Sequence, residues 1–200
     1  MHLLGISFGL GNSKIGEVFT FSLPSVITCP GASSWCKKYC YSLSYERLRP
    51  TCRIAYEHNL LLAKDSKQFE KIIIGILPRI LSCMRIHVSG DFWSTQYIES
   101  WIEICSAFPQ TKFLTYTRSW IIPELFKPLE SLRNLPNVEV FASTDPTMPL
   151  PPTGWRIAFI KTDKRANGLK CSQQEGLLSS CLKCGYCFRK EKGNVIFKVH

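Results

Sequence analysis

The stretch MRIHVSGDFWSTQYIESWIEICSAFPQTKFLTYTRSWIIPELFKPLESLRNLPNVEVFAS, residues 84–143, decides the fold class. Short runs of apolar, β-branched and aromatic residues alternate in it with longer helical segments, and prolines mark where one helix ends and the next begins. The strands are expected at residues 84–89, 112–117 and 138–143, and the helices at 95–108 and 123–133. Strands that alternate with helices run parallel to one another, so the stretch predicts a β-α-β-α-β unit.

The same alternation continues on both sides of this unit. Residues 17–23 alternate and are mostly β-branched or aromatic, which predicts a first strand that runs into Pro24. Apolar residues between 52 and 81 recur at three- and four-residue steps, as in one or two helices broken near Asp65, and residues 155–160 predict a further strand. Such units close into a barrel or lie in a doubly wound sheet. We expect an α/β fold, a partial TIM-type (β/α) barrel of about five parallel strands.

Polar and charged residues follow the expected strands. In both β-α arrangements the functional groups gather at the carboxyl ends of the strands, so we expect an active site there. Arg118 could pair with a carboxylate of a cofactor or substrate, or form a surface ion pair instead. The residues at these strand ends are Cys29, Ser89-Gly90-Asp91, Thr117-Arg118, Thr144-Asp145 and Lys161-Thr162-Asp163.

Seven of the ten cysteines fall in two short clusters. The sequence has no long uncharged apolar run and no basic region ahead of one at its N-terminus, so we expect a soluble, cytoplasmic protein with no membrane partner. In a reducing compartment, clustered cysteines are more often metal ligands than disulfides. The isolated Cys52, Cys83 and Cys105 are expected to be core thiols, and His87 a core or barrel-interior histidine.

The first cluster is Cys29, Cys36 and Cys40, spaced C-x6-C-x3-C after the first strand. Three thiolates around a [4Fe-4S] cluster leave one iron without a protein ligand, and a substrate or cofactor can chelate that iron. A zinc ion with three protein ligands and a water is the rival chemistry, and incidental core thiols are a third possibility. We expect an iron-sulfur cluster.

The second cluster is Cys171, Cys181, Cys184 and Cys187, which could close a site fully. Its C-x2-C-x2-C run has the two-residue spacing found in bacterial ferredoxins, whereas zinc sites usually use two separated C-x2-C pairs. Closed coordination implies a structural or electron-transfer role. The expectation is a second [4Fe-4S] cluster, with structural zinc as the alternative.

These residues resemble the radical S-adenosylmethionine superfamily: a first strand, a three-cysteine loop with an aromatic residue before the last cysteine, and β-α units of a partial TIM barrel. The usual superfamily spacing is C-x3-C-x2-C, so C-x6-C-x3-C is a departure. The resemblance implies that Tyr39 contacts the adenine and that Ser89, Gly90 and Asp91 hold the methionine amino group. It further implies reductive cleavage of S-adenosylmethionine to a 5'-deoxyadenosyl radical, with an electron donor such as flavodoxin or ferredoxin and an unknown substrate.

A closer resemblance is to the gene product 88 family of phages and plasmids, and it runs over most of the chain. It implies a radical-SAM-like β/α core at residues 1–163 and, at 164–200, a cysteine-rich appendage with an auxiliary cluster. The motifs that carry it are Gly11-Asn12-Ser13-Lys14, Phe21-Ser22-Leu23-Pro24, Thr28-Cys29-Pro30-Gly31-Ala32, Cys40-Tyr41, Ser89-Gly90-Asp91-Phe92, Tyr116-Thr117-Arg118-Ser119 and the terminal cysteines.

The charge distribution supports a second hypothesis from another functional class. The formal net charge is +10, and residues 161–200 hold nine Lys or Arg against three Asp or Glu. A basic end of this kind could meet nucleic acid or be a solvated face. The alternative function is therefore a non-catalytic nucleic-acid-binding protein, stabilised by zinc or an iron-sulfur cluster.

Overall fold

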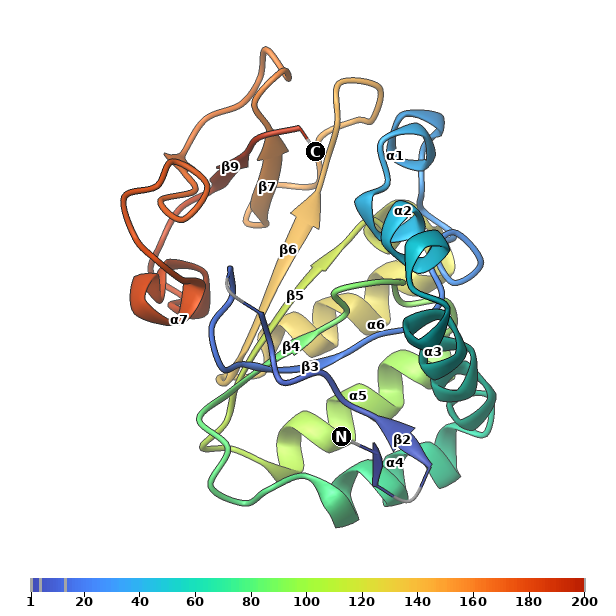
Figure 1. The fold of residues 1–200 in the computed structure, drawn as a ribbon. Helices are drawn as coiled ribbons and strands as arrows, with labels where there is room; N and C mark the ends of the chain where they lie inside the picture. The colour runs from blue at the N-terminus through green and yellow to red at the C-terminus, as the bar shows by residue number, and fades with distance from the viewer. Residues whose placement is uncertain (1, 4, 13, 200) are drawn as a thin grey trace.

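The computed structural model describes residues 2–3, 5–12 and 14–199 and contains one large parallel sheet (Figure 1). Every neighbouring pair in this sheet runs parallel. Its seven strands, in spatial order, are β3 (Phe19–Phe21), β4 (Cys83–Ile86), β5 (Lys112–Thr117), β6 (Val138–Ser143), β7 (Arg156–Ile160), β9 (Val195–Phe197) and β8 (Leu169–Lys170).

The α/β fold with parallel strands is confirmed, and the predicted strands all exist. β5 and β6 have the bounds expected from the sequence. The sheet has seven strands and not about five, because β8 and β9 of the C-terminal segment join it. Closure into a partial barrel stays a prediction.

Three long helices cover one face of the sheet. α4 (Ser66–Ile76), α5 (Thr95–Ala107) and α6 (Pro123–Asn134) contact one another in sequence order. Side chains that point to this face, such as Met84, Ile86 and Phe113, belong to the main hydrophobic core with Trp101 and Leu129 of the helices. Burial of such side chains is the main favourable term in folding.

The C-terminal segment covers part of the opposite face. A second, smaller core joins Leu114, Phe141 and Val195 with Cys187 and Phe188 of that segment packed against them. The segment includes the single helical turn α7 (Cys181–Cys184) and the 3-10 turn η2 (Tyr186–Phe188). In Figure 1 it lies on the left, beside β7 and β9. The expected boundary after residue 163 stays a prediction, but the sheet itself continues through it.

The 3-10 helix η1 (Ser119–Ile121) follows β5, and the remaining elements lie before β4. α1 (Ser34–Lys38) and α2 (Tyr41–Leu48) follow the loop after β3 and lead into α3 (Pro50–Ala63), on the right in Figure 1. α3 and α4 divide at Asp65, as the sequence predicts, and Asp65 caps α4 by accepting from the Gln68 amide. A small antiparallel pair, β1 (His2–Leu3) and β2 (Ile6–Ser7), completes the fold. Within the described residues, no helix is long and apolar enough to span a membrane.

Candidate functional site

Two glycines allow the three-cysteine loop to lie on the carboxyl ends of the strands. A Cβ at Gly31 would overlap the carbonyl oxygen of Arg118, just after β5. A Cβ at Gly90 would lie 2.6 Å from side-chain atoms of both Leu23 and Thr28, and Gly90 has φ +80°. Both positions therefore need glycine, the second also for its backbone conformation. The close contacts bring the loop that carries Cys29 against the ends of β4 and β5.

Helix starts position the other two N-terminal cysteines. Ser33 caps α1, and its Oγ accepts from the Cys36 amide at 3.0 Å. Cys40 caps α2, and its Sγ accepts from the Leu43 amide at 3.4 Å. These capping contacts fix the backbone of both cysteines at the starts of α1 and α2.

The three thiols lie near one another and near charged groups on neighbouring strands. Burial raises the pKa of Cys29, and the charges of Asp91, Cys36 and Cys40 raise it further. Burial also raises the pKa of Cys36, whereas Arg118 opposes that rise. The structure therefore brings Asp91 and Arg118, both predicted cofactor-binding residues, within electrostatic reach of these thiols.

Asp91 links the ends of β4 and β5. Its carboxylate accepts from Thr117 Oγ1 at 2.6 Å, the Phe92 amide at 2.7 Å and the Arg118 amide at 2.8 Å. Burial raises the pKa of Asp91, and these hydrogen bonds oppose the shift. Because these donors come from the ends of both strands, Asp91 fixes the two strand ends relative to each other.

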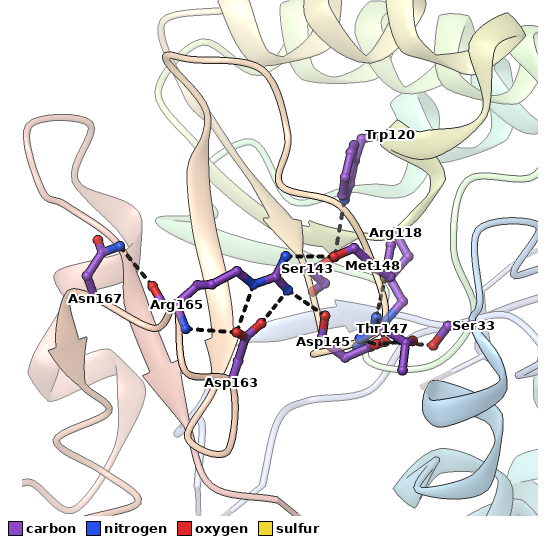
Figure 2. A network of polar contacts seen from close by, with 10 residues as sticks. All are labelled: Ser33, Arg118, Trp120, Ser143, Asp145, Thr147, Met148, Asp163, Arg165 and Asn167. Carbon is purple, nitrogen blue, oxygen red and sulfur yellow. Dashed lines mark hydrogen bonds and ion pairs between the residues drawn. The ribbon is translucent and has the colours of Figure 1, made fainter.

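Arg118 and Asp145 form a buried ion pair at the ends of β5 and β6 (Figure 2). Arg118 Nη1 lies 2.5 Å from Asp145 Oδ2, and the side chains are 12% and 0% exposed. Asp145 also accepts from Ser33 Oγ at 2.6 Å and from Thr147 Oγ1 at 2.6 Å. Burial alone would raise the pKa of Asp145, but the hydrogen bonds from Ser33 and Thr147 and the charge of Arg118 hold it below its usual value.

A second ion pair, in the segment that follows β7, supports the first (Figure 2). Arg165 binds Asp163 through Nε at 2.9 Å and Nη2 at 2.6 Å, a two-point contact. The same guanidinium donates to the backbone oxygens of Asp145 and Met148, at 2.9 and 2.8 Å. Arg165 therefore fixes the loop after β6, in which Asp145 lies.

Glu46 is a buried carboxylate of α2 that holds the loop after β3 against β4. Its Oε1 accepts from Ser89 Oγ at 2.7 Å, the Ser25 amide at 3.0 Å and Ser42 Oγ at 3.3 Å. The hydroxyl of Ser89, a predicted cofactor-binding residue, is thus engaged within the protein. Tyr39 lies at the end of α1, 40% exposed, with its ring centroid 4.7 Å from that of Trp35.

The four C-terminal cysteines line a cavity. Ser180 caps α7, and Gly185, with φ +63°, ends it and turns the chain toward Cys187. Cys171 is held by its amide, which donates to the Ile196 oxygen at 2.9 Å and continues the pairing of β8 with β9. A cavity of about 60 Å³ results, and its lining includes Cys171, Cys181, Cys184, Cys187, Arg85 and Tyr116.

Arg85 and Tyr116 come to this cavity from β4 and β5. The Arg85 guanidinium carbon lies 5.1 Å from the Tyr116 ring centroid, and Arg85 Nε is buried without a hydrogen-bond partner among the described residues. Burial raises the pKa of Cys181, and Arg85 opposes that rise. Burial raises the pKa of Cys187 to about 11, against a hydrogen bond from Tyr116.

Comparison with known proteins places the chain in a family. The sequence profile described as Gene product 88 matches residues 7–190. The chain belongs to the gene product 88 family. It is 26% identical to the Gene 88 protein of Mycobacterium phage L5, over 94% of this chain and 90% of the relative. It is 25% identical to the Gene 88 protein of Mycobacterium phage D29, with the same coverage. No solved structure matches the chain.

The geometry of this gene product 88 protein adds residues that the sequence reasoning did not assign. Glu46, Ser33 and Arg85 were not among the predicted site residues, and Asp145 was noted only as a strand-end residue. One signal existed for Glu46, the single acidic residue among five Lys or Arg between residues 34 and 56. Ser33 and Arg85 gave no such signal, because their partners lie on distant segments.

The remaining histidine and cysteine predictions concern the core. His87 is buried, and its Nε2 lies 2.8 Å from Tyr97 Oη, so it is a core histidine as predicted. Burial, with a smaller effect of Arg85, lowers the pKa of His87 to about 3. Cys83 and Cys105 are buried, as predicted, and Cys52 is half-buried in α3.

Neither cysteine set is arranged like the ligands of a single ion. Among the described residues, no group of three or more His, Cys, Asp or Glu side chains could hold a metal ion as placed. The donor sets themselves, three thiols and four thiols, are ligands that iron-sulfur clusters and zinc both use.

Proposed function

We propose that this chain is an iron-sulfur protein with radical S-adenosylmethionine-type activity. The observation that carries the proposal is the gathering of Cys29 and Cys36 with Asp91 and Arg118 at the carboxyl ends of parallel strands. Three thiolates from Cys29, Cys36 and Cys40 would hold a [4Fe-4S] cluster with one open iron. Such a cluster, once reduced, supplies one electron for the cleavage of S-adenosylmethionine.

The surrounding residues have the donors and acceptors that this cofactor needs. The Asp91 carboxylate, an acceptor at the strand ends, suits the methionine amino group. Arg118 has five N–H donors and uses Nη1 for Asp145, so its other donors suit the carboxylate. Gly90 places backbone next to this position, Ser89 is held there by Glu46, and Tyr39 offers an exposed ring to the adenine.

The C-terminal set would hold a second cluster through four thiolates and leave no iron open. We assign it electron transfer or a structural role. Arg85 and the Tyr116 hydroxyl would offset the negative charge of the ligands there, since buried charge needs compensation.

Anaerobic reconstitution tests the proposal. Two [4Fe-4S] clusters require about 8 Fe per chain, and S-adenosylmethionine should alter the electron paramagnetic resonance spectrum of the N-terminal cluster. Cys36→Ala should lower iron to about 4 per chain and abolish 5'-deoxyadenosine formation with dithionite. Cys52→Ala, which removes an isolated thiol of α3, is the matched control and should change neither.

Two results would count against this function. Stoichiometric zinc without iron would favour the non-catalytic, metal-stabilised nucleic-acid-binding protein. Intact clusters that neither respond to S-adenosylmethionine nor cleave it would leave an electron-transfer or structural protein.

A further inference from the structure

Helix α2 exposes its apolar face. Tyr41, Tyr45 and Leu48 recur at helical spacing and are 41%, 40% and 81% exposed, whereas Ser42 and Glu46 on the other side are buried. The hydrogen bonds of Glu46 to Ser25, Ser42 and Ser89 hold the helix in this orientation. An apolar helix face that is fixed toward solvent is typical of a binding surface.

Positive charge surrounds this face. Between residues 34 and 56, Lys37, Lys38, Arg47, Arg49 and Arg53 are all exposed, and the single acidic residue, Glu46, is buried. Arg53 pairs with Glu57, but the structure gives no ion pair for the other four cations within the described residues. Arg49 lies over the Tyr45 ring, 4.9 Å from its centroid. We call Lys37, Lys38, Tyr41, Tyr45, Arg47, Leu48 and Arg49 the α1–α2 surface.

We propose that the α1–α2 surface binds single-stranded nucleic acid. Each nucleotide of a single strand offers an unpaired base with a flat π face and, one bond further, a phosphate. Exposed tyrosine rings interleaved with Lys and Arg that form no ion pair among the described residues match that repeat, because bases stack on the rings and phosphates pair with the cations. In a duplex the bases are already stacked on each other, so the rings would have less to bind.

The surface is separate from the basic C-terminal end. In Figure 1, α1 and α2 lie on the right, and the C-terminal segment with α7 and β9 lies on the left, beside β7. The net charge of +10 attracts a polyanion to the whole molecule, so charge alone does not select between the two sides. The exposed tyrosine rings favour the α1–α2 side, because they lie on α2. The inference uses these rings and cations and no metal cluster, so its test is separate from that of the proposed enzyme activity.

Fluorescence anisotropy with labelled oligo(dT) and oligo(U) of about 16 nucleotides tests the proposal. The 200-residue chain, as purified, should bind both. Its binding should weaken as salt rises, with about 0.7 units of log–log slope for each phosphate contact. The duplex of the same length and poly-glutamate are the comparison ligands. Each should bind at least about fivefold more weakly than the single strand, which is the low end of one stacked base.

Variants separate stacking from charge. Tyr45→Ala should weaken binding at least about fivefold, and Tyr45→Phe, which keeps the ring, should restore it. Arg47→Gln with Arg49→Gln should reduce the salt slope by about 1.4, two phosphates at 0.7 each. The matched control is Lys164→Gln with Lys192→Gln, which removes two exposed charges near β7 and β9 and should leave the slope unchanged.

Several results would overturn the proposal. The first is the absence of oligonucleotide binding by the wild type at low salt. Equal binding of duplex or poly-glutamate would show a general response to polyanions. Equal salt slopes for the two double variants would show that the α1–α2 surface is not the binding site. Binding would then lie at the C-terminal end or be spread over the whole molecule. If Tyr45→Ala does not fold, an unchanged salt slope in the Arg47→Gln, Arg49→Gln variant is sufficient to refute the proposal.

Discussion

Replacement of Asp145 by alanine should destabilise the chain by about 3–5 kcal/mol, the range for breaking a buried ion pair on one side. The change leaves the Arg118 guanidinium, only 12% exposed, without its carboxylate. It also removes the acceptor of the Ser33 and Thr147 hydroxyls. Ser33 in turn caps the helix that carries Cys36, so the loss should extend to the N-terminal thiols.

Urea unfolding followed by circular dichroism measures this free energy. A double-mutant cycle with Arg118→Met isolates the coupling of the pair, expected at about 1.5–3 kcal/mol. The matched control is Glu130→Ala, which breaks an ion pair of 3.0 Å with Arg133 whose side chains are 29% and 27% exposed. That change should cost no more than about 1 kcal/mol for the ion pair. A coupling below about 0.5 kcal/mol would refute the argument that burial makes the Arg118–Asp145 pair strong.

The pair also implies a pH dependence. The folded pKa of Asp145 is lowered, so its contribution is fully present above the unfolded pKa of about 3.9. It is lost as pH falls through the lower folded pKa. Asp145→Asn should therefore show less loss of stability on acidification in that range than the wild type.

Three further predictions concern other buried groups. Glu46→Ala should lower the free energy of unfolding by roughly 3–5 kcal/mol, since three donors lose their common acceptor. Glu46→Gln should lower it by less, since the oxygen Oε1 remains. Equal losses for the two variants would contradict this. Arg85→Gln should lower the reduction potential of the proposed C-terminal cluster by at least tens of millivolts, because a nearby unit charge is worth about 1 kcal/mol even at the dielectric constant of water. An unchanged potential in a redox titration would contradict this. The pKa of His87 is lowered to about 3, so the stability of the fold should fall as pH drops from about 6.5 toward 3, because the unfolded chain takes up the proton first. The urea midpoints of His87→Asn should lack this part of the pH dependence.

The strands could be predicted where local residues alone determine them. β5 and β6 are buried on both faces, so their apolar and β-branched residues identify them without knowledge of the partner strands. β8 and β9 have two and three residues and were not predicted. Strands this short depend on pairing with distant segments, here β9 with β7, and local propensity does not reveal such pairing.

The site could be predicted by residue type at strand ends but not by pairing. Asp91 and Arg118 were identified because polar residues at the ends of parallel strands converge. The bond from Ser33 to Asp145 spans 112 residues, and no spacing rule predicts it. Arg85 lies within a strand, where a charged residue suggests exposure, yet its face of the sheet is covered by the C-terminal segment.

The two cysteine sets differ in what surrounds them, and that difference bears on their roles. The N-terminal thiols lie at strand ends with Asp91, Arg118 and Asp145, groups that can orient a polar ligand. The C-terminal thiols line a cavity with mostly aliphatic and aromatic neighbours, one guanidinium and the Tyr116 hydroxyl. Apolar surroundings exclude water and thereby influence the reduction potential of a buried redox group. Polar surroundings can bind and orient a ligand. We therefore propose ligand binding at the first set and electron transfer or structural support at the second.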